Sequence, residues 1–133
     1  MDVTLIPVGD LRAHEEIKPN HLRRMIDKLR TQGHYHKPIL VDRDSGCILD
    51  GHHRWTAAKA LELNRVPAIE LDYLEDDRIE VDVWPTAALE MITKEDVLSM
   101  AASEEVFPAK TSRHTVRFEI PRIEVGFDEL SSA

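Results

Sequence analysis

The stretch ILDGHHRWTAAKAL, residues 48–61, predicts a short strand that turns directly into a helix. Its apolar start ends at Asp50 and Gly51, and an alanine-rich helical pattern follows. A glycine at such a corner lets the backbone approach a ligand or adopt a positive φ. The free N–H groups and positive dipole end of the following helix form a natural site for anions. The stretch therefore predicts a phosphate-binding corner, which consists of Asp50, Gly51, His52, His53 and Arg54.

Two side chains of this corner suit a phosphorylated ligand in particular. Arg54 can make a bidentate contact with phosphate oxygens. Asp50, at the carboxyl end of the strand, can hold a Mg²⁺ ion beside that phosphate. A plainer interpretation is that Asp50 only caps the helix and that both histidines point into solvent. The corner alone leaves both interpretations open.

Hydrophobic periodicity and turn signals outside the corner predict further strands and two more helices. One helix starts near Pro19 and ends at Gly33. A capping box formed by Thr93 and Asp96 starts another, which runs to about Val106. A turn of sequence RDSG joins two strands into a hairpin, and a polar loop precedes the last strand. The predicted strands are Val3–Val8, Pro38–Asp42, Cys47–Asp50, Val66–Tyr73, Arg78–Trp84 and Thr115–Ile120.

Length and composition agree with one domain, residues 1–133, with a single core. Strands mixed with about three helices predict a compact α+β fold with a small mixed sheet. The formal net charge of −8 makes the chain a poor general binder of nucleic-acid phosphates. The single cysteine, Cys47, excludes an intrachain disulfide and favours a reducing compartment. Since there is no signal-peptide pattern and no apolar stretch of membrane-spanning length, we expect a cytoplasmic protein without a membrane partner; the oligomeric state stays open.

A second polar spot, HEE at residues 14–16, lies in the loop before the first predicted helix. A carboxylate in such a loop can act as a general base toward a hydroxyl group. A solvated acidic loop is the simpler interpretation. These residues by themselves do not decide between the two.

Two further polar spots lie in the second half of the chain. The segment KTSRH, residues 110–114, combines two cations with two hydroxyl groups. This set suits a carboxylate or a phosphate, but it is also common in exposed basic loops. Trp84, at the end of an alternating strand, can line a ligand or belong to the core. His34 and His36 offer imidazoles to a metal, but one cysteine cannot make a cysteine-rich zinc site.

The segment PILVD…CILDGHHRWTAAKALELNRVPAIELDY, residues 38–73, resembles the ParB/sulfiredoxin superfamily. In that superfamily a strand, a glycine-bearing motif and a helix form a nucleotide-phosphate site. His52 stands where sulfiredoxins carry their catalytic cysteine, so the resemblance does not imply sulfinic acid reduction. Gly51, Arg54 and Ala57 match the CTP-binding motif of chromosome-partitioning ParB proteins. Those proteins also carry a helix-turn-helix DNA-binding domain, for which we expect this chain to be too short and too acidic.

Within the superfamily, the strongest resemblance is to free L-serine kinases. The block LRAHEEIKP resembles the segment that carries their catalytic base, which implies Glu15 for this role. The block ILDGHHRW matches their phosphate- and metal-binding motif, which implies Asp50, with Mg²⁺, and His52 as catalytic groups. VFPAKTSRH resembles their Lys-Thr-Thr-Arg-His block. Trp84 matches a tryptophan that lies near their amino-acid substrate. The resemblance implies that Gly51, His52, His53 and Arg54 bind phosphate and that Trp84, Lys110, Thr111, Ser112, Arg113 and His114 bind the acceptor.

The implied activity is Mg²⁺-dependent phosphoryl transfer from ATP or ADP to the hydroxyl of free L-serine or a similar hydroxy amino acid. Lys28 falls near a serine-contacting position of the kinases, and a large insert of the archaeal kinases is missing, so threonine stays an alternative acceptor. An alternative from another class is a regulatory module that binds CTP or ATP without catalysis. A nuclease fits the acidic charge badly and lacks a dense carboxylate cluster for two metals.

Overall fold

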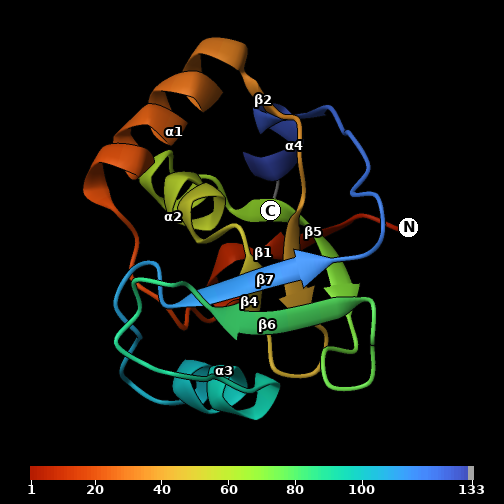
Figure 1. Ribbon diagram of the computed structural model, residues 1–133. Helices are drawn as coiled ribbons and strands as arrows, with labels where there is room; N and C mark the ends of the chain where they lie inside the picture. The colour runs from red at the N-terminus through yellow and green to blue at the C-terminus, as the bar shows by residue number, and fades with distance from the viewer. Residues whose placement is uncertain (132–133) are drawn as a thin grey trace.

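The central sheet of the computed structural model contains β1 (Thr4–Pro7), β3 (Ile39–Asp42), β4 (Ile48–Asp50) and β5 (Arg65–Leu71) (Figure 1). The structure describes residues 1–131. The order of strands is β1-β5-β3-β4, in which β3 and β5 run parallel and the two outer pairings are antiparallel. The sheet is therefore mixed, and β3 and β4 form the predicted hairpin.

Both faces of this sheet are covered, as the alternation along β3 shows. Ile39 and Val41 pack into one core cluster, whereas Leu40 packs into a second cluster. Every residue of β3 is buried, which agrees with its nearly continuous apolar sequence. The first cluster lies beneath three helices, which are α1 (Pro19–Gln32), α2 (His52–Ala60) and α4 (Phe127–Ser131).

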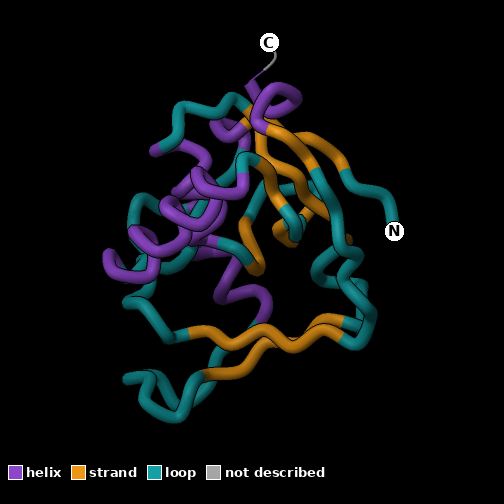
Figure 2. The backbone as a smooth tube through the Cα atoms, turned by 90° about the horizontal axis from the view of Figure 1, so that it is seen from above, coloured by secondary structure: helices purple, strands orange, loops and turns teal. Residues whose placement is uncertain are grey.

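A two-stranded ribbon and a helix contribute to the second cluster. The ribbon consists of β6 (Ile79–Val83) and β7 (Ser112–Val116), which pair antiparallel, and the helix is α3 (Lys94–Ala102). Figure 2 shows the ribbon set apart from the central sheet. The capping box of α3 is formed as predicted, because Asp96 N–H donates to Thr93 Oγ1 at 3.1 Å and Thr93 N–H donates to the Asp96 carboxylate at 2.9 Å.

The α+β class with a small mixed sheet is confirmed, but the predicted end of one helix and both predicted ends of one strand are wrong. Helix α3 ends at Ala102 and not near Val106, because Ser103 adopts an extended backbone and its hydroxyl donates to the Met100 carbonyl. Strand β7 spans Ser112–Val116 and not Thr115–Ile120. Polar residues at its start are held in the strand by pairing with β6, which periodicity in one segment does not reveal.

The sequence predicted about three helices and did not predict several short elements. Besides α4, they are the strands β2 (His34–Tyr35) and β8 (Val125–Gly126), which pair antiparallel, and the 3-10 helix η1 (Val8–Asp10). Elements this short carry no readable period, and their conformation depends on distant partners. Among residues 1–131, no helix combines the length and the apolar character needed to cross a membrane.

Candidate active site

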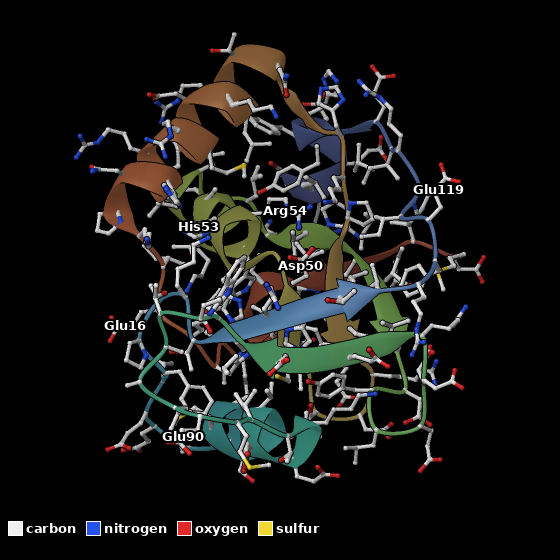
Figure 3. All side chains as sticks on the ribbon, viewed as in Figure 1. Glu16, Asp50, His53, Arg54, Glu90 and Glu119 are labelled. Atoms are coloured by element: carbon white, nitrogen blue, oxygen red, sulfur yellow. The ribbon has the colours of Figure 1, made fainter. Side chains whose placement is uncertain are left out.

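One cavity of about 510 Å³ brings together the polar segments that the sequence singles out. The β4–α2 corner, the loop before α1 and the start of β7 all contribute to its lining. Glu15 and Ser112 meet in this lining although they are 97 residues apart. Figure 3 shows Asp50, His53 and Arg54 gathered around the start of α2.

Gly51 gives the corner its shape. It is the N-cap of α2 and adopts a left-handed backbone with φ of 107°. A Cβ atom at this position would lie 2.4 Å from Cγ2 of Ile39, which is fully buried in β3. The corner therefore needs glycine both for its φ and for its close approach to β3.

Arg54 connects the corner with the sheet. Its Nη2 donates to Asp50 Oδ2 at 3.1 Å, and its Nη1 donates to the Pro38 carbonyl at 3.2 Å. Helix α2 has no side-chain hydrogen bond at its N-cap, so Asp50 pairs with Arg54 and does not cap the helix. The plainer interpretation of Asp50 as a helix cap is therefore wrong.

The donor set of the corner fits a magnesium ion that is shared with a phosphorylated ligand. The Asp50 side chain is 45% exposed, and Arg54 engages only one of its two carboxylate oxygens. Among residues 1–131, no group of three or more histidine, cysteine or acidic residues can hold a metal by itself. Magnesium in phosphate sites commonly takes one or two carboxylates and completes its shell with phosphate and water. Asp50 can supply such a carboxylate.

The two histidines of the corner hold the loop that carries Glu15. Nε2 of His52 accepts the backbone N–H of His14 at 3.2 Å, and Nε2 of His53 accepts the backbone N–H of Lys18 at 3.0 Å. Burial lowers the pKa of both histidines below their ordinary value, so both rings are neutral near pH 7. Since Nε2 is the acceptor, the proton of each ring sits on Nδ1. Only Nδ1 is left to donate to a phosphate.

Glu15 is anchored through one carboxylate oxygen. Its Oε1 accepts the backbone N–H of Ser112 at 2.7 Å and the Ser112 hydroxyl at 2.8 Å. The surrounding backbone is fixed as well, because Phe107 N–H donates to the His14 carbonyl and Glu16 N–H donates to the Phe107 carbonyl, both at 2.8 Å. Glu15 is half-buried, and these bonds leave its Oε2 free of Ser112.

Trp84 and two cations form another part of the lining. Lys110 Nζ lies 4.5 Å and Arg113 Cζ lies 5.1 Å from the centroid of the Trp84 ring. The indole N–H donates to the Ser112 carbonyl at 3.0 Å, which fixes the ring. Lys110 has a φ of 63°, a conformation that is uncommon for non-glycine residues and that is found more often at functional sites than elsewhere. Lys110 and Arg113 can therefore bind an anionic group of a ligand in this cavity.

Thr111 differs from its neighbours in the predicted KTSRH block. Its hydroxyl donates to the Pro108 carbonyl at 2.7 Å, its side chain is buried, and it lies outside the cavity lining. This contact shapes the turn before β7. Lys110, Ser112, Arg113 and His114 do line the cavity.

Sequence reasoning assigned no role to two buried side chains that support the site. His14 is fully buried, with its Nε2 3.0 Å from Ser112 Oγ. Tyr73 is also fully buried, and its hydroxyl oxygen lies 2.8 Å from His114 Nε2. His14 stood in a quoted motif beside Glu15, but its partner lies 98 positions away, so only the fold reveals the contact.

The buried histidines predict a loss of stability at mildly acidic pH. Burial lowers the pKa of His14 to about 4 and that of His114 to about 3, from an ordinary value of 6.5. As pH falls below 6.5, these histidines become protonated in the unfolded chain but stay neutral in the folded chain. The free energy of unfolding therefore decreases with falling pH until the pH reaches the pKa values of the folded state. Each histidine contributes up to about 1.4 kcal/mol per pH unit to this loss. Urea unfolding at about pH 7.5, 6 and 5 measures it.

The His114→Asn variant provides a control for this prediction, because its unfolded state has one proton fewer to bind. We expect its free energy of unfolding to fall less steeply between about pH 6 and 5 than that of the unmodified protein. Identical slopes for the two proteins would contradict the origin assigned to the pH dependence.

A strand–glycine–helix corner beside an anchored carboxylate, on a small mixed sheet, defines an α+β domain with one polar cavity at that corner. The chain belongs to the ParB N-terminal domain family, whose model matches residues 1–83. This match contains Glu15, the corner and β6, but not the start of β7.

Curated relatives extend the similarity. The chain is 38% identical over 98 residues to an ATP-dependent L-serine kinase of Staphylothermus marinus, a match that covers 71% of this chain and 38% of the relative. It is 32% identical over 88 residues to the ADP-dependent L-serine kinase SerK of Thermococcus kodakarensis, covering 63% of this chain and 36% of that protein. The matched region thus spans little more than a third of the length of these relatives.

Solved structures share the fold over nearly the whole chain. A free serine kinase in complex with AMP superposes with a TM-score of 0.86 at 20% identity, covering 97% of this chain and 93% of that chain. SbnI with C-terminal truncation from Staphylococcus aureus gives a TM-score of 0.77 at 14% identity, covering 95% of this chain and 88% of the other. At these identities the likeness establishes the fold.

Proposed function

We propose that this chain is a kinase that transfers a phosphoryl group from ATP or ADP to the hydroxyl of free L-serine. One observation carries the proposal: the loop with Glu15 is bonded on one side to the phosphate corner and on the other to β7, around a single cavity. Glu15 lies between the phosphate corner on one side and the cations Lys110 and Arg113 on the other. A general base for an acceptor hydroxyl needs such a position. The names of the curated L-serine kinase relatives support the same reaction.

The charge of the cavity supports a nucleotide as phosphoryl donor. Although the chain carries a net charge of −8, six cations line this cavity against three carboxylates. Such a local excess attracts a polyphosphate to an otherwise acidic protein. The lining cations are Lys18, Lys28, Lys37, Arg54, Lys110 and Arg113.

In the proposed mechanism the protein mainly aligns its substrates and stabilises charge. Arg54 and the N–H groups at the start of α2 bind the phosphates of the donor. Asp50 would hold a Mg²⁺ ion, and this ion would supply neutralisation of the negative charge on the phosphates. Glu15 takes the proton of the acceptor hydroxyl as that oxygen bonds to phosphorus, and the bond from phosphorus to the nucleotide oxygen breaks. Nδ1–H of His52 is available to a phosphate oxygen.

The acceptor is bound through its carboxylate in this proposal. Arg113 and Lys110, which lie over the Trp84 ring, offer the charge that a free amino acid requires. Lys28 also lines the cavity, at the position where we expected a serine contact by resemblance. Threonine therefore belongs beside serine in any test of the acceptor.

A direct assay tests the proposed reaction. The protein is incubated with Mg²⁺, ATP or ADP, and a panel of hydroxy amino acids, and products are followed by phosphorus NMR. We expect a phosphomonoester signal with L-serine. If the protein binds nucleotide but forms no product with any pair, the proposal fails and a nucleotide-binding regulatory module explains the site better.

Replacement of Asp50 tests whether this residue is a ligand of the Mg²⁺ ion. We expect Asp50→Asn to weaken nucleotide binding in the presence of Mg²⁺ at least about tenfold, or 1.4 kcal/mol, because the neutral amide is a poor magnesium ligand. Calorimetry with and without Mg²⁺ measures the effect. Asp44→Asn, in the exposed turn between β3 and β4, makes the same change of charge outside the cavity. An equal loss of affinity in the absence of Mg²⁺ would point to the Arg54 contact instead of the metal.

A further inference from the structure

The hydrogen bonds around Glu15 continue into the interior of the protein. Ser112 Oγ lies 2.8 Å from Glu15 Oε1 and 3.0 Å from His14 Nε2. On the other side of the imidazole, His14 Nδ1 lies 3.8 Å from Cys47 Sγ. His14 and Cys47 are 0% exposed, and Ser112 is 8% exposed. Four side chains from three separate segments are thus connected, and only Glu15 reaches the cavity as a charged group.

The chemistry of these groups sets the direction of the hydrogen bonds. A hydroxyl has one proton, so Ser112 donates either to Glu15 or to His14. An ionised carboxylate can only accept, which directs the hydroxyl proton toward Glu15 Oε1. Nε2 of His14 then carries the ring proton and donates to Ser112 Oγ. In the opposite arrangement, lone pairs of Ser112 and Glu15 would face each other at 2.8 Å.

The groups on the other side of the imidazole are compatible with this direction but do not fix it. With the proton on Nε2, Nδ1 of His14 is an acceptor and faces the Cys47 sulfur. Burial raises the pKa of the Cys47 thiol to about 12, so the thiol keeps its proton. Its sulfur lies 3.6 Å from the Ile48 carbonyl oxygen and 3.8 Å from His14 Nδ1, and the thiol can donate weakly to one of the two. The competing tautomer has its proton on Nδ1, where the backbone of Ile48 is the available partner.

His14 is unsuited to accept the proton that Glu15 removes from a substrate. Burial lowers the pKa of His14 to about 4, against a smaller opposite effect of the Ile48 backbone. An imidazolium at this depth is therefore unfavourable, and His52 lies close by, with ring centroids 4.6 Å apart. The neutral ring serves to orient its partner.

We propose that His14 is a positioning residue for Glu15 and acts through Ser112. The chain from His14 Nε2–H to Ser112 Oγ–H to Glu15 Oε1 holds one carboxylate oxygen and leaves Oε2 for the acceptor hydroxyl. The catalytic consequence rests on the kinase function proposed above. The direction of the hydrogen bonds is a property of the protein alone, so it can be tested without substrate.

The first test reads the tautomer of His14 directly. Long-range proton–nitrogen NMR spectra of the histidine-labelled protein at about pH 7.5 show which ring nitrogen carries the proton. The His14→Gln variant identifies the signal by its loss. We expect the proton on Nε2 in the unmodified protein and in Ser112→Thr, and a larger share on Nδ1 in Ser112→Ala. A proton on Nδ1 in the unmodified protein would overturn the proposal.

The second test separates positioning from substrate binding. We expect Ser112→Ala and His14→Leu to lower kcat up to about 100-fold, because a carboxylate that is slightly misplaced loses its alignment. The KM values for serine and nucleotide should stay within about twofold. Ser112→Thr keeps the hydroxyl and His14→Gln keeps an N–H donor, so each should recover most of kcat. If instead KM rises and kcat stays constant, Ser112 binds the acceptor and the proposal is wrong.

Ser45 provides a matched control for the serine variant. Its backbone N–H and hydroxyl both donate to Oδ2 of Asp42, at 3.1 Å and 2.6 Å, so the same pair of bonds recurs outside the cavity. The Ser45 hydroxyl oxygen also accepts the backbone N–H of Cys47 at 3.1 Å, a contact that does not involve the thiol. We expect Ser45→Ala to change kcat less than twofold. If the unmodified protein phosphorylates no acceptor, the kinase proposal fails while the NMR result still decides the direction of the hydrogen-bond chain.

Discussion

Glu15→Gln is expected to lower the turnover of serine phosphorylation by about 100- to 10,000-fold, the usual contribution of a positioned general base. Glutamine has the shape of glutamate, and its amide oxygen can still accept both hydrogen bonds from Ser112. The loop should therefore stay in place while the base is lost. Steady-state kinetics and nucleotide titration of the same variant measure the two quantities, and we expect nucleotide affinity to change by less than about threefold.

The neighbouring carboxylate offers a matched control. Glu16 is exposed and its side chain does not share the Ser112 contacts, so Glu16→Gln makes the same change of charge one position away. We expect a much smaller loss of turnover, less than about tenfold. Similar losses for both variants would mean that the negative charge of the loop matters and that Glu15 is not the base.

Gly51→Ala is expected to destabilise the fold by about 2–5 kcal/mol, the combined cost of a strained backbone and an overpacked core. The new Cβ would meet Cγ2 of Ile39 at 2.4 Å and Nη2 of Arg54 at 3.0 Å. Ile39 is fully buried in the central sheet and cannot move away, so the corner itself must shift. Denaturant unfolding measures the stability, and calorimetry should show weakened nucleotide binding as Arg54 is displaced.

Gly9→Ala is the control for this substitution. Gly9 lies in η1, and a Cβ there would meet no atom within 4 Å. We expect the free energy of unfolding to change by no more than about 0.5 kcal/mol. If Gly51→Ala were equally mild, the close approach between the corner and β3 would not matter to the fold.

The corner was predictable because its signals are local. A short apolar run, a glycine and an alanine-rich pattern occupy adjacent positions in residues 48–61. Each pattern predicts the backbone conformation of the residues that form it. The structure has this strand as β4 and this helix as α2, with Gly51 between them at positive φ. The capping box of α3 was predictable for the same reason, since Thr93 and Asp96 lie within one turn.

The roles of individual side chains were less predictable because their partners are distant. Both corner histidines were expected to contact phosphate or solvent, yet each accepts a backbone N–H from the loop that carries Glu15. Thr111 was grouped with acceptor-binding residues, but its hydroxyl bonds to Pro108 outside the cavity lining. Side-chain direction follows from packing between segments, which the spacing within one segment does not describe.

The amino-acid sequence by itself determined the α+β class, the glycine corner and the identity of the polar groups, because these depend on residue type and on neighbours within a few positions. Only the tertiary structure decided that Glu15 meets Ser112, that His52 and His53 tie its loop to the corner, and that His14 stands behind Ser112. The physical reason is that hydrogen-bond geometry requires contact within about 3 Å. Only folding creates such contact between residues nearly 100 positions apart in this chain.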